Sequence, residues 1–177
     1  MKNDKYQIQY RIPSARWQSW DYHAAAAYFI TICTANREQF FGHIENGVMQ
    51  LTELGNICER EWIKTPDIRP DMNLTLDAFI VMPNHFHGII VIGDNQFNAD
   101  ENAIQIGGLF APQAKNLASI LRGFKSAVTS HARKSKIVFD WQTRFHDHVI
   151  RNATEFEFIR DYIVNNPANW AADRFKT

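Results

Sequence analysis

Stretches of β-branched and aromatic residues predict a sheet of four main strands. Residues 25–34, 73–82 and 85–92 have the composition and apolar spacing that favour strands. Residues 143–151 form a shorter strand by the same criterion. Asn46-Gly47 lies between apolar flanks, and this dipeptide predicts a tight hairpin turn. We therefore expect a main sheet and one small hairpin.

Three segments place apolar residues at helical spacing, and they span residues 51–64, 116–134 and 154–166. Thr52 and Thr154 precede the first and third apolar patterns, so each is expected to cap its helix. Pro66 is expected to end the first helix and Pro167 the third, since proline disfavours helical geometry in the residue before it.

Without the hairpin and the last helix, the order of elements is βαββαβ. This order predicts an α+β, ferredoxin-like fold, in which helices cover one face of an antiparallel sheet. The last helix is an addition to that pattern. A length of 177 residues fits one domain. We expect an N-terminal arm over residues 1–24, a core over residues 25–170, and a polar loop over residues 93–108.

Composition favours a soluble chain with a substantial core. Hydrophobic residues make up 45% of the sequence, yet no apolar run approaches the roughly 20 residues that a membrane helix needs. The N-terminus lacks the apolar region of a signal peptide. Cys33 and Cys58 stand alone, which is typical of reduced thiols in a cytoplasmic protein. We therefore expect a cytoplasmic protein that does not contact a membrane.

A formal net charge of zero argues at first against a nucleic-acid partner. The charge is nevertheless segregated along the chain, with +3 in residues 1–37, −8 in residues 38–112 and +5 in residues 113–177. If the two basic ends meet in space, they would form a phosphate-binding face. Ordinary solvated surface is the alternative interpretation.

Two histidines interrupt the apolar strand at residues 85–92. Residues two apart in a strand share a face, so His85 and His87 project in the same direction and could bind one metal ion. The alternative is a pair of partly buried, hydrogen-bonded histidines. His146 and His148 have the same spacing, with Asp147 on the opposite face. Spacing alone does not choose between the two pairs.

The predicted C-terminal helix offers both a third ligand and a nucleophile. Tyr162 and Asn166 are four residues apart and therefore share one helical face. The Asn166 amide oxygen could join two histidines on a metal, which would bring the Tyr162 hydroxyl close to whatever the metal binds. A phenol beside a cation is a candidate nucleophile for phosphoryl chemistry. Alternatively, Tyr162 is an amphipathic tyrosine at the edge of the core.

Three motifs together carry a family resemblance. They are VMPNHFHGIIVI at residues 81–92, WQTRFHDHVIRN at residues 141–152 and YIVNNPANW at residues 162–170. In this order and at these separations they resemble the REP-associated tyrosine transposases, a branch of the insertion-sequence-200-like transposases and of the HUH (His–hydrophobic–His) endonucleases. The resemblance extends over residues 28–170.

The resemblance implies a ferredoxin-like, single-tyrosine nuclease. It assigns Mg²⁺ or Mn²⁺ to His85 and His87, completes the metal site with Asn166, and makes Tyr162 the nucleophile. Its substrate is single-stranded DNA beside a short hairpin, cleaved through a 5′-phosphotyrosine intermediate. His146 and His148 then belong to the scaffold or to the substrate side of the site.

DNA contacts are expected from two regions. Lys115, Arg122 and Lys125 on the long helix are candidates for contacts to backbone phosphates. The N-terminal stretch could grip unpaired bases or pack on its own domain, and its basic and aromatic residues are Arg11, Arg16, Trp17 and Trp20. We expect a monomer rather than a homodimer, because no apolar surface helix is evident.

Two other functions fit the same residues. One is a domesticated DNA-binding protein that has lost cleavage. The other is a metal-dependent hydrolase in which His146 and His148 act with an activated water and no covalent step. Only the transposase-type reaction leaves DNA attached to the protein.

Overall fold

The computed structural model describes residues 20–98 and 115–176, and its centre is a four-stranded antiparallel sheet. The strand order is β4-β5-β1-β6. The strands are β1 (Ala26–Cys33), β4 (Leu74–Met82), β5 (His85–Ile92) and β6 (His146–Ile150). This order and the two helical crossovers confirm the predicted α+β, ferredoxin-like fold.

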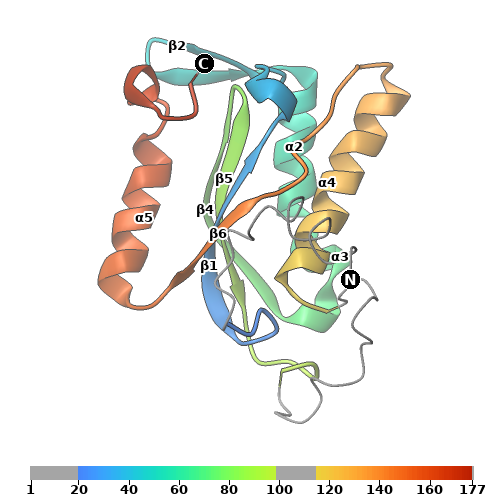
Figure 1. The fold of residues 1–177 in the computed structure, drawn as a ribbon, viewed down its shortest axis with the longest axis vertical. Coiled ribbons are helices and arrows are strands. Elements are labelled where there is room, and N and C mark those ends of the chain that lie inside the picture. Colours follow the sequence, from blue (N-terminus) through green and yellow to red (C-terminus); the bar gives the residue numbers. More distant parts are fainter. Residues whose placement is uncertain (1–19, 99–114, 177) are drawn as a thin grey trace, which may run out of the picture.

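Helices cover both faces of the sheet, not one. The crossover helices α2 (Glu53–Ile63) and α4 (Leu117–Lys134) lie on one side, and the added helix α5 (Ala153–Asn165) lies on the other (Figure 1). Each helix buries an apolar stripe against the sheet because its apolar residues recur every three or four positions. The fold therefore has three layers, and α5 covers the face opposite the two crossover helices.

Two hydrophobic clusters match these layers. The larger cluster joins the sheet to α2 and α4, and its centre is the aromatic group Trp62, Phe86 and Phe124, with ring centroids 4.7 to 5.4 Å apart. The smaller cluster joins Ile89 of β5 to Ile159 and Ile163 of α5. The smaller cluster fixes α5 against β4 and β5.

Local signals for the hairpin and for α2 are confirmed. Strands β2 (Gly42–Glu45) and β3 (Val48–Leu51) pair around Asn46 and Gly47, whose φ angles of 51° and 76° match a type I′ turn. Thr52 caps α2 by accepting a hydrogen bond from the Gly55 backbone N–H.

Two expectations about helix ends are wrong. Pro66 does not end α2; it lies in the first turn of a further short helix, α3 (Thr65–Ile68), where a missing N–H costs nothing. Asn152, not Thr154, caps α5, because the Asn152 side chain accepts from the Glu155 backbone N–H. Short 3-10 turns lie at Ala35–Arg37, Pro70–Met72 and Trp170–Ala172.

The structure covers only some of the remaining segments for which the sequence made predictions. Within residues 20–98 and 115–176, no helix is long and apolar enough to cross a membrane. Arg11, Arg16 and Trp17, and most of the predicted loop at residues 93–108, lie outside the described residues. The division into an arm and a core, and the monomeric state, stay predictions.

Gly123 on α4 gives a direct test of the helix. It is exposed in the helix interior, and an added Cβ would meet no atom within 4 Å. Gly123→Ala should therefore raise the free energy of unfolding by about 0.5–1 kcal/mol, measured by urea denaturation. Gly88→Ala should instead lower it by about 1–3 kcal/mol, because the new Cβ would lie 2.9 Å from the Phe86 ring. Equal effects of the two changes would contradict the packing described here.

Candidate metal and nucleophile site

His85 and His87 are both completely buried on the face of the sheet that α5 covers. Strand β5 places them there because its alternate residues share a face, and the next position on that face, Ile89, packs against α5. Their ring centroids are 4.5 Å apart. The shared face predicted for the pair is therefore observed.

Hydrogen bonding fixes the tautomer of His85. The Asn84 amide nitrogen donates to the backbone carbonyls of Arg37 and Phe175, at 3.1 and 2.8 Å, so Asn84 Oδ1 faces His85 Nδ1 at 2.9 Å. An amide oxygen only accepts, so His85 Nδ1 carries the proton. His85 Nε2 is left with a free lone pair, and it is buried without a hydrogen-bond partner among residues 20–98 and 115–176.

His87 is held in a similar way. Its Nδ1 lies 2.8 Å from Thr31 Oγ1, the hydroxyl of its cross-strand neighbour on β1. Its Nε2 lies 3.4 Å from the Tyr162 hydroxyl oxygen. A partner on Nδ1 that orients the ring is the usual arrangement around metal-binding histidines.

Burial keeps both rings uncharged at neutral pH. Removal from water lowers the pKa of His85 to about 2, assisted by the neighbouring His87, Arg37 and Arg174. The same cause, assisted by Arg174, lowers the pKa of His87 to about 3. Neutral imidazole is the form that binds a metal.

Asp173 supplies a carboxylate that the sequence did not indicate. Its Oδ2 lies 3.9 Å from His85 Nε2, and one ligand atom from each of Asp173, His85 and His87 lies within 4.8 Å of the others. Its side chain is only 3% exposed. The Phe175 backbone N–H donates to its other oxygen at 2.6 Å. Two imidazoles and a carboxylate form a set that suits a divalent cation.

Tyr162 of α5 lies beside this group, and Asn166 follows as the C-cap of the same helix. The Asn166 side-chain oxygen is buried and has no hydrogen-bond partner in the described residues. The Tyr162 side chain packs edge-on against Phe29 and remains 38% exposed. Burial and the Asp173 charge raise the pKa of the Tyr162 hydroxyl, against smaller opposing effects of Asn166 and Arg174. The hydroxyl is therefore protonated at neutral pH.

Residues 170–176, which we call the closing segment, cover the two histidines. The Phe175 ring lies 4.8 Å from the His85 ring and 5.6 Å from the His87 ring, centroid to centroid. Trp170 lies 6.1 Å from His85. The Arg37 and Arg174 guanidinium groups each lie 4.6 Å from the centre of the Phe175 ring. The same segment thus both supplies Asp173 and shields the histidines from water.

The second histidine pair does not join this group. His146 pairs with Thr31 across β6 and β1, so it lies two strands, or roughly 10 Å, from His87 on the same face. His148 is engaged by Glu155 of α5, with His148 Nε2 2.7 Å from the carboxylate. Both residues are exposed.

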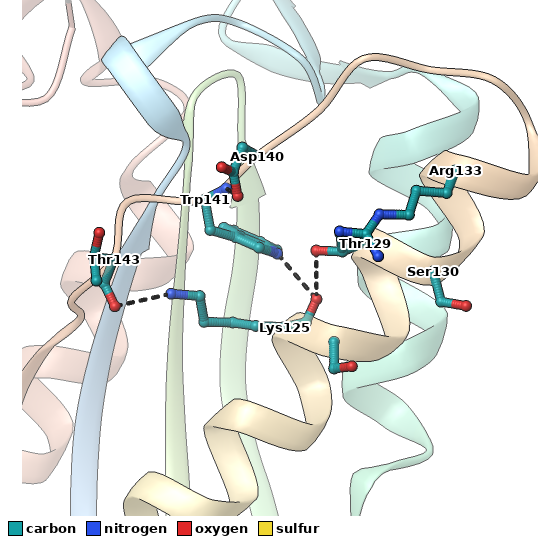
Figure 2. Close-up of a pocket in the computed structure, with 8 residues that line it drawn as sticks. Lys125, Thr129, Ser130, Arg133, Asp140, Trp141 and Thr143 are labelled. Atoms are coloured by element: carbon teal, nitrogen blue, oxygen red, sulfur yellow. Dashed lines mark hydrogen bonds between the residues drawn. The ribbon is translucent and has the colours of Figure 1, made fainter.

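The residues expected to contact DNA lie away from the histidines. Lys115 pairs with Asp71 and lies over the Phe97 ring. Lys125 donates from Nζ to the Gln142 carbonyl at 2.6 Å. It also lies 3.4 Å from the Thr143 carbonyl (Figure 2).

Arg122 and Lys125 lie on α4, but Lys115 precedes the N-cap Asn116 and is therefore not on the helix, contrary to the expectation. Arg122 is exposed on α4, across the sheet from the buried histidines. Trp20 is half-buried and donates to the Tyr28 hydroxyl at 3.2 Å, so this part of the arm packs on its own domain. Arg16 and Trp17, outside the described residues, stay predictions.

Comparison with known proteins gives one close relative. No family model matches the chain. An uncharacterized protein of Haemophilus influenzae is 39% identical over 165 residues, which cover 91% of each chain. The chain belongs to the family of this Haemophilus influenzae protein.

Comparison of structures supports the fold. A REP-associated tyrosine transposase, solved bound to a REP hairpin, is similar with a TM-score of 0.58. The similarity covers 90% of this chain and 77% of the other, at 20% sequence identity. At that identity the similarity shows a transposase-like fold, which agrees with the fold that the sequence motifs implied.

Metal binding can be tested by titration with Mn²⁺ in a calorimeter. His85→Ala and His87→Ala should each weaken binding at least tenfold, because each removes a buried nitrogen ligand, and Asp173→Asn should weaken it by a similar factor. His146→Ala is the matched control and should bind as the parent does. Loss of binding in His146→Ala with retention in His85→Ala would place the metal at the other pair.

Stability of the metal-free protein should depend on pH through the two buried histidines. Below pH 6.5 the unfolded chain takes up protons at these rings and the folded chain does not, so the free energy of unfolding falls as pH is lowered towards 3. Each ring should lower the free energy of unfolding by about 1.4 kcal/mol for each pH unit below 6.5.

Urea unfolding in EDTA between pH 6.5 and 5 measures this slope. His87→Gln should reduce the slope by about half, because His85 still contributes. His146→Gln, which alters an exposed ring on the same face, should keep the slope of the parent. A parent slope of zero would mean that the histidines are hydrated.

Proposed function

We propose that this protein is a metal-dependent single-stranded DNA endonuclease and strand transferase of the REP-associated tyrosine transposase type. The observation that carries the proposal is the Tyr162 hydroxyl, 3.4 Å from Nε2 of a buried, neutral histidine that belongs to a metal-capable group. The substrate is DNA beside a short hairpin. The hairpin bound to the transposase of similar fold supports this choice.

The residues present fit a divalent cation. His85 Nε2 and Asn166 Oδ1 are buried acceptors without partners, and Asp173 and His87 complete a mixed nitrogen and oxygen set. When bound, the cation would neutralise charge on the scissile phosphate and make phosphorus more electrophilic. Imidazole suits Mn²⁺ better than Mg²⁺, so Mn²⁺ should bind at least as well.

Tyr162 then acts as the nucleophile. Its Oη forms a bond to phosphorus while the bond from phosphorus to the DNA 3′ oxygen breaks. The phenol loses its proton and the leaving 3′ oxygen gains one, so a 5′-phosphotyrosine and a 3′-hydroxyl result. The T-shaped contact with Phe29 and the contact with His87 hold the ring in place for this attack. The phosphotyrosine keeps the bond energy needed for strand joining.

Access to the site requires movement of the closing segment. His85 and His87 are completely buried, and Phe175 lies against both rings. A phosphate can approach their nitrogen atoms only after Phe175 shifts. Since Asn84 holds the Phe175 carbonyl by one hydrogen bond, this shift breaks few contacts of the main core.

Two other functions compete with this proposal. A protein that binds DNA without cleaving it would keep the closing segment in place, so the complete burial of the histidines is compatible with it. A hydrolase built on His146 and His148 is less favoured, because Glu155 already engages His148.

Tyr162→Phe separates these functions. The change removes one oxygen and keeps the ring that packs on Phe29, so the variant should fold and bind Mn²⁺ and DNA almost as well as the parent. It should form no covalent adduct with labelled hairpin-flanked single strands, because a phenyl ring has no nucleophile. Asn166→Ala should form the adduct slowly and recover in part at high Mn²⁺. The assay is a band shift that survives boiling in detergent.

Tyr22→Phe is the matched control, since Tyr22 packs with the core on the α2 and α4 side of the sheet. It should form as much adduct as the parent. An adduct in Tyr162→Phe would identify another nucleophile. No adduct in the parent, with DNA binding intact, would establish the binding-only function.

A further inference from the structure

A cavity of about 500 Å³ lies on the α4 side of the molecule, away from the histidines (Figure 2). Its α4 wall carries two cations and three hydroxyls, which are Lys125, Ser126, Thr129, Ser130 and Arg133. The opposite wall is the segment that leads from α4 into β6, with Trp141 at its centre. The function proposed above does not use this cavity.

Helical spacing explains the polar wall. Ser126, Thr129, Ser130 and Arg133 follow one another at intervals of three, one and three residues, so they form one flank of α4. The buried apolar residues of α4 occupy the flank that meets the sheet. The polar flank thus lines the cavity opposite the 140–143 segment, whose Trp141 side chain belongs to the core.

Hydrogen bonds hold the two walls together. Trp141 Nε1 donates to the Lys125 backbone carbonyl at 3.2 Å, and Lys125 Nζ donates to the Gln142 carbonyl at 2.6 Å. Trp141 also forms a bridge with Thr34 at the end of β1. The cavity is therefore a fixed part of the fold, since its outer wall is attached to both α4 and the sheet.

Positive charge in the cavity is balanced only in part, because Lys125 and Arg133 share the lining with one carboxylate, Asp140. Neither Lys125 nor Arg133 forms an ion pair within the part of the chain that the structure describes. Asp140 is the one acidic residue in the described lining, and its Oδ1 accepts from the Trp141 backbone N–H. Burial lowers the pKa of Lys125, which a bound anion would reverse. A guanidinium, an ammonium and hydroxyls are the groups that contact DNA phosphates.

The edge strand connects the cavity to the nuclease site. Thr143 lines the cavity, and β6 begins three residues later at His146. His146, Thr31 and His87 then lie in one row across the sheet. Two strand spacings from His87 to His146 and three residues from His146 to Thr143 give a path of at most roughly 20 Å. A single strand that left the site across β1 and around the β6 edge would reach this cavity within that length.

We propose that the cavity is a second DNA-binding site, which holds a backbone phosphate of the single strand that flanks the cleavage point. Arg133 and the hydroxyls of Ser126 and Ser130 contact the phosphate, and Lys125 adds charge from the floor. The inference rests on the proposed function for its substrate. It assigns the cavity a positioning role, since a phosphate contact carries no base sequence information.

Arg133→Ala tests the site, with Lys134→Ala as the matched control. Both residues are exposed cations in the last turns of α4, but only Arg133 lines the cavity. Fluorescence anisotropy would compare a labelled hairpin with a long single-stranded flank and the same hairpin with the flank trimmed. Arg133→Ala should weaken binding of the long substrate several-fold and reduce the slope of log affinity against log salt by about 0.7. It should not alter binding of the trimmed substrate, and Lys134→Ala should alter neither.

The adduct assay, run on the trimmed substrate, separates this inference from the proposed function. If the parent forms the adduct and Arg133→Ala matches Lys134→Ala on the long flank, the cavity does not bind DNA and the nuclease stands. If the parent forms no adduct but Arg133→Ala selectively weakens the long substrate, the second site stands and the nuclease fails. A parent that binds neither substrate overturns both.

Discussion

The hydrogen bonds of one buried amide, Asn84, hold the candidate site together. The Asn84 side chain donates to the carbonyls of Arg37 and Phe175 and presents its oxygen to His85. Its backbone carbonyl accepts from both the N–H and the hydroxyl of Thr34. Asn84 therefore connects the turn between β4 and β5 to the end of β1 and to the closing segment. The same residue fixes the tautomer of His85.

The candidate site contains buried polar atoms that destabilise the fold when unpaired, and these atoms have the chemistry of metal ligands. His85 Nε2 and Asn166 Oδ1 are buried acceptors without partners, and each such atom costs about 1–3 kcal/mol relative to a paired one. If a divalent cation binds both atoms, as proposed above, it removes that cost, and metal binding and folding stability would then be coupled. The low pKa values of the two histidines also favour metal binding, because no proton competes for their nitrogen atoms at neutral pH.

The sheet separates two kinds of polar surface. The α5 face holds two buried, uncharged histidines and the Asp173 carboxylate beside Tyr162, which suits chemistry on one phosphate. The α4 face holds a polar cavity lined by two cations and one carboxylate, which suits contacts to a backbone. Strand β6 is the edge strand of the sheet next to β1, and its two histidines are exposed.

The sequence by itself determined the features that follow from residue spacing within one element and from the order of the elements. Alternation along β5 placed His85 and His87 on one face, helical spacing placed Tyr162 one turn from Asn166, and element order implied the ferredoxin-like sheet. Only the tertiary structure decided which distant groups meet. It brought Asp173 to His85, directed Lys125 to backbone carbonyls, and put α5 on the face opposite α2 and α4. The physical reason is that spacing fixes the direction of a side chain relative to its own element, whereas contacts between elements depend on packing of the whole chain.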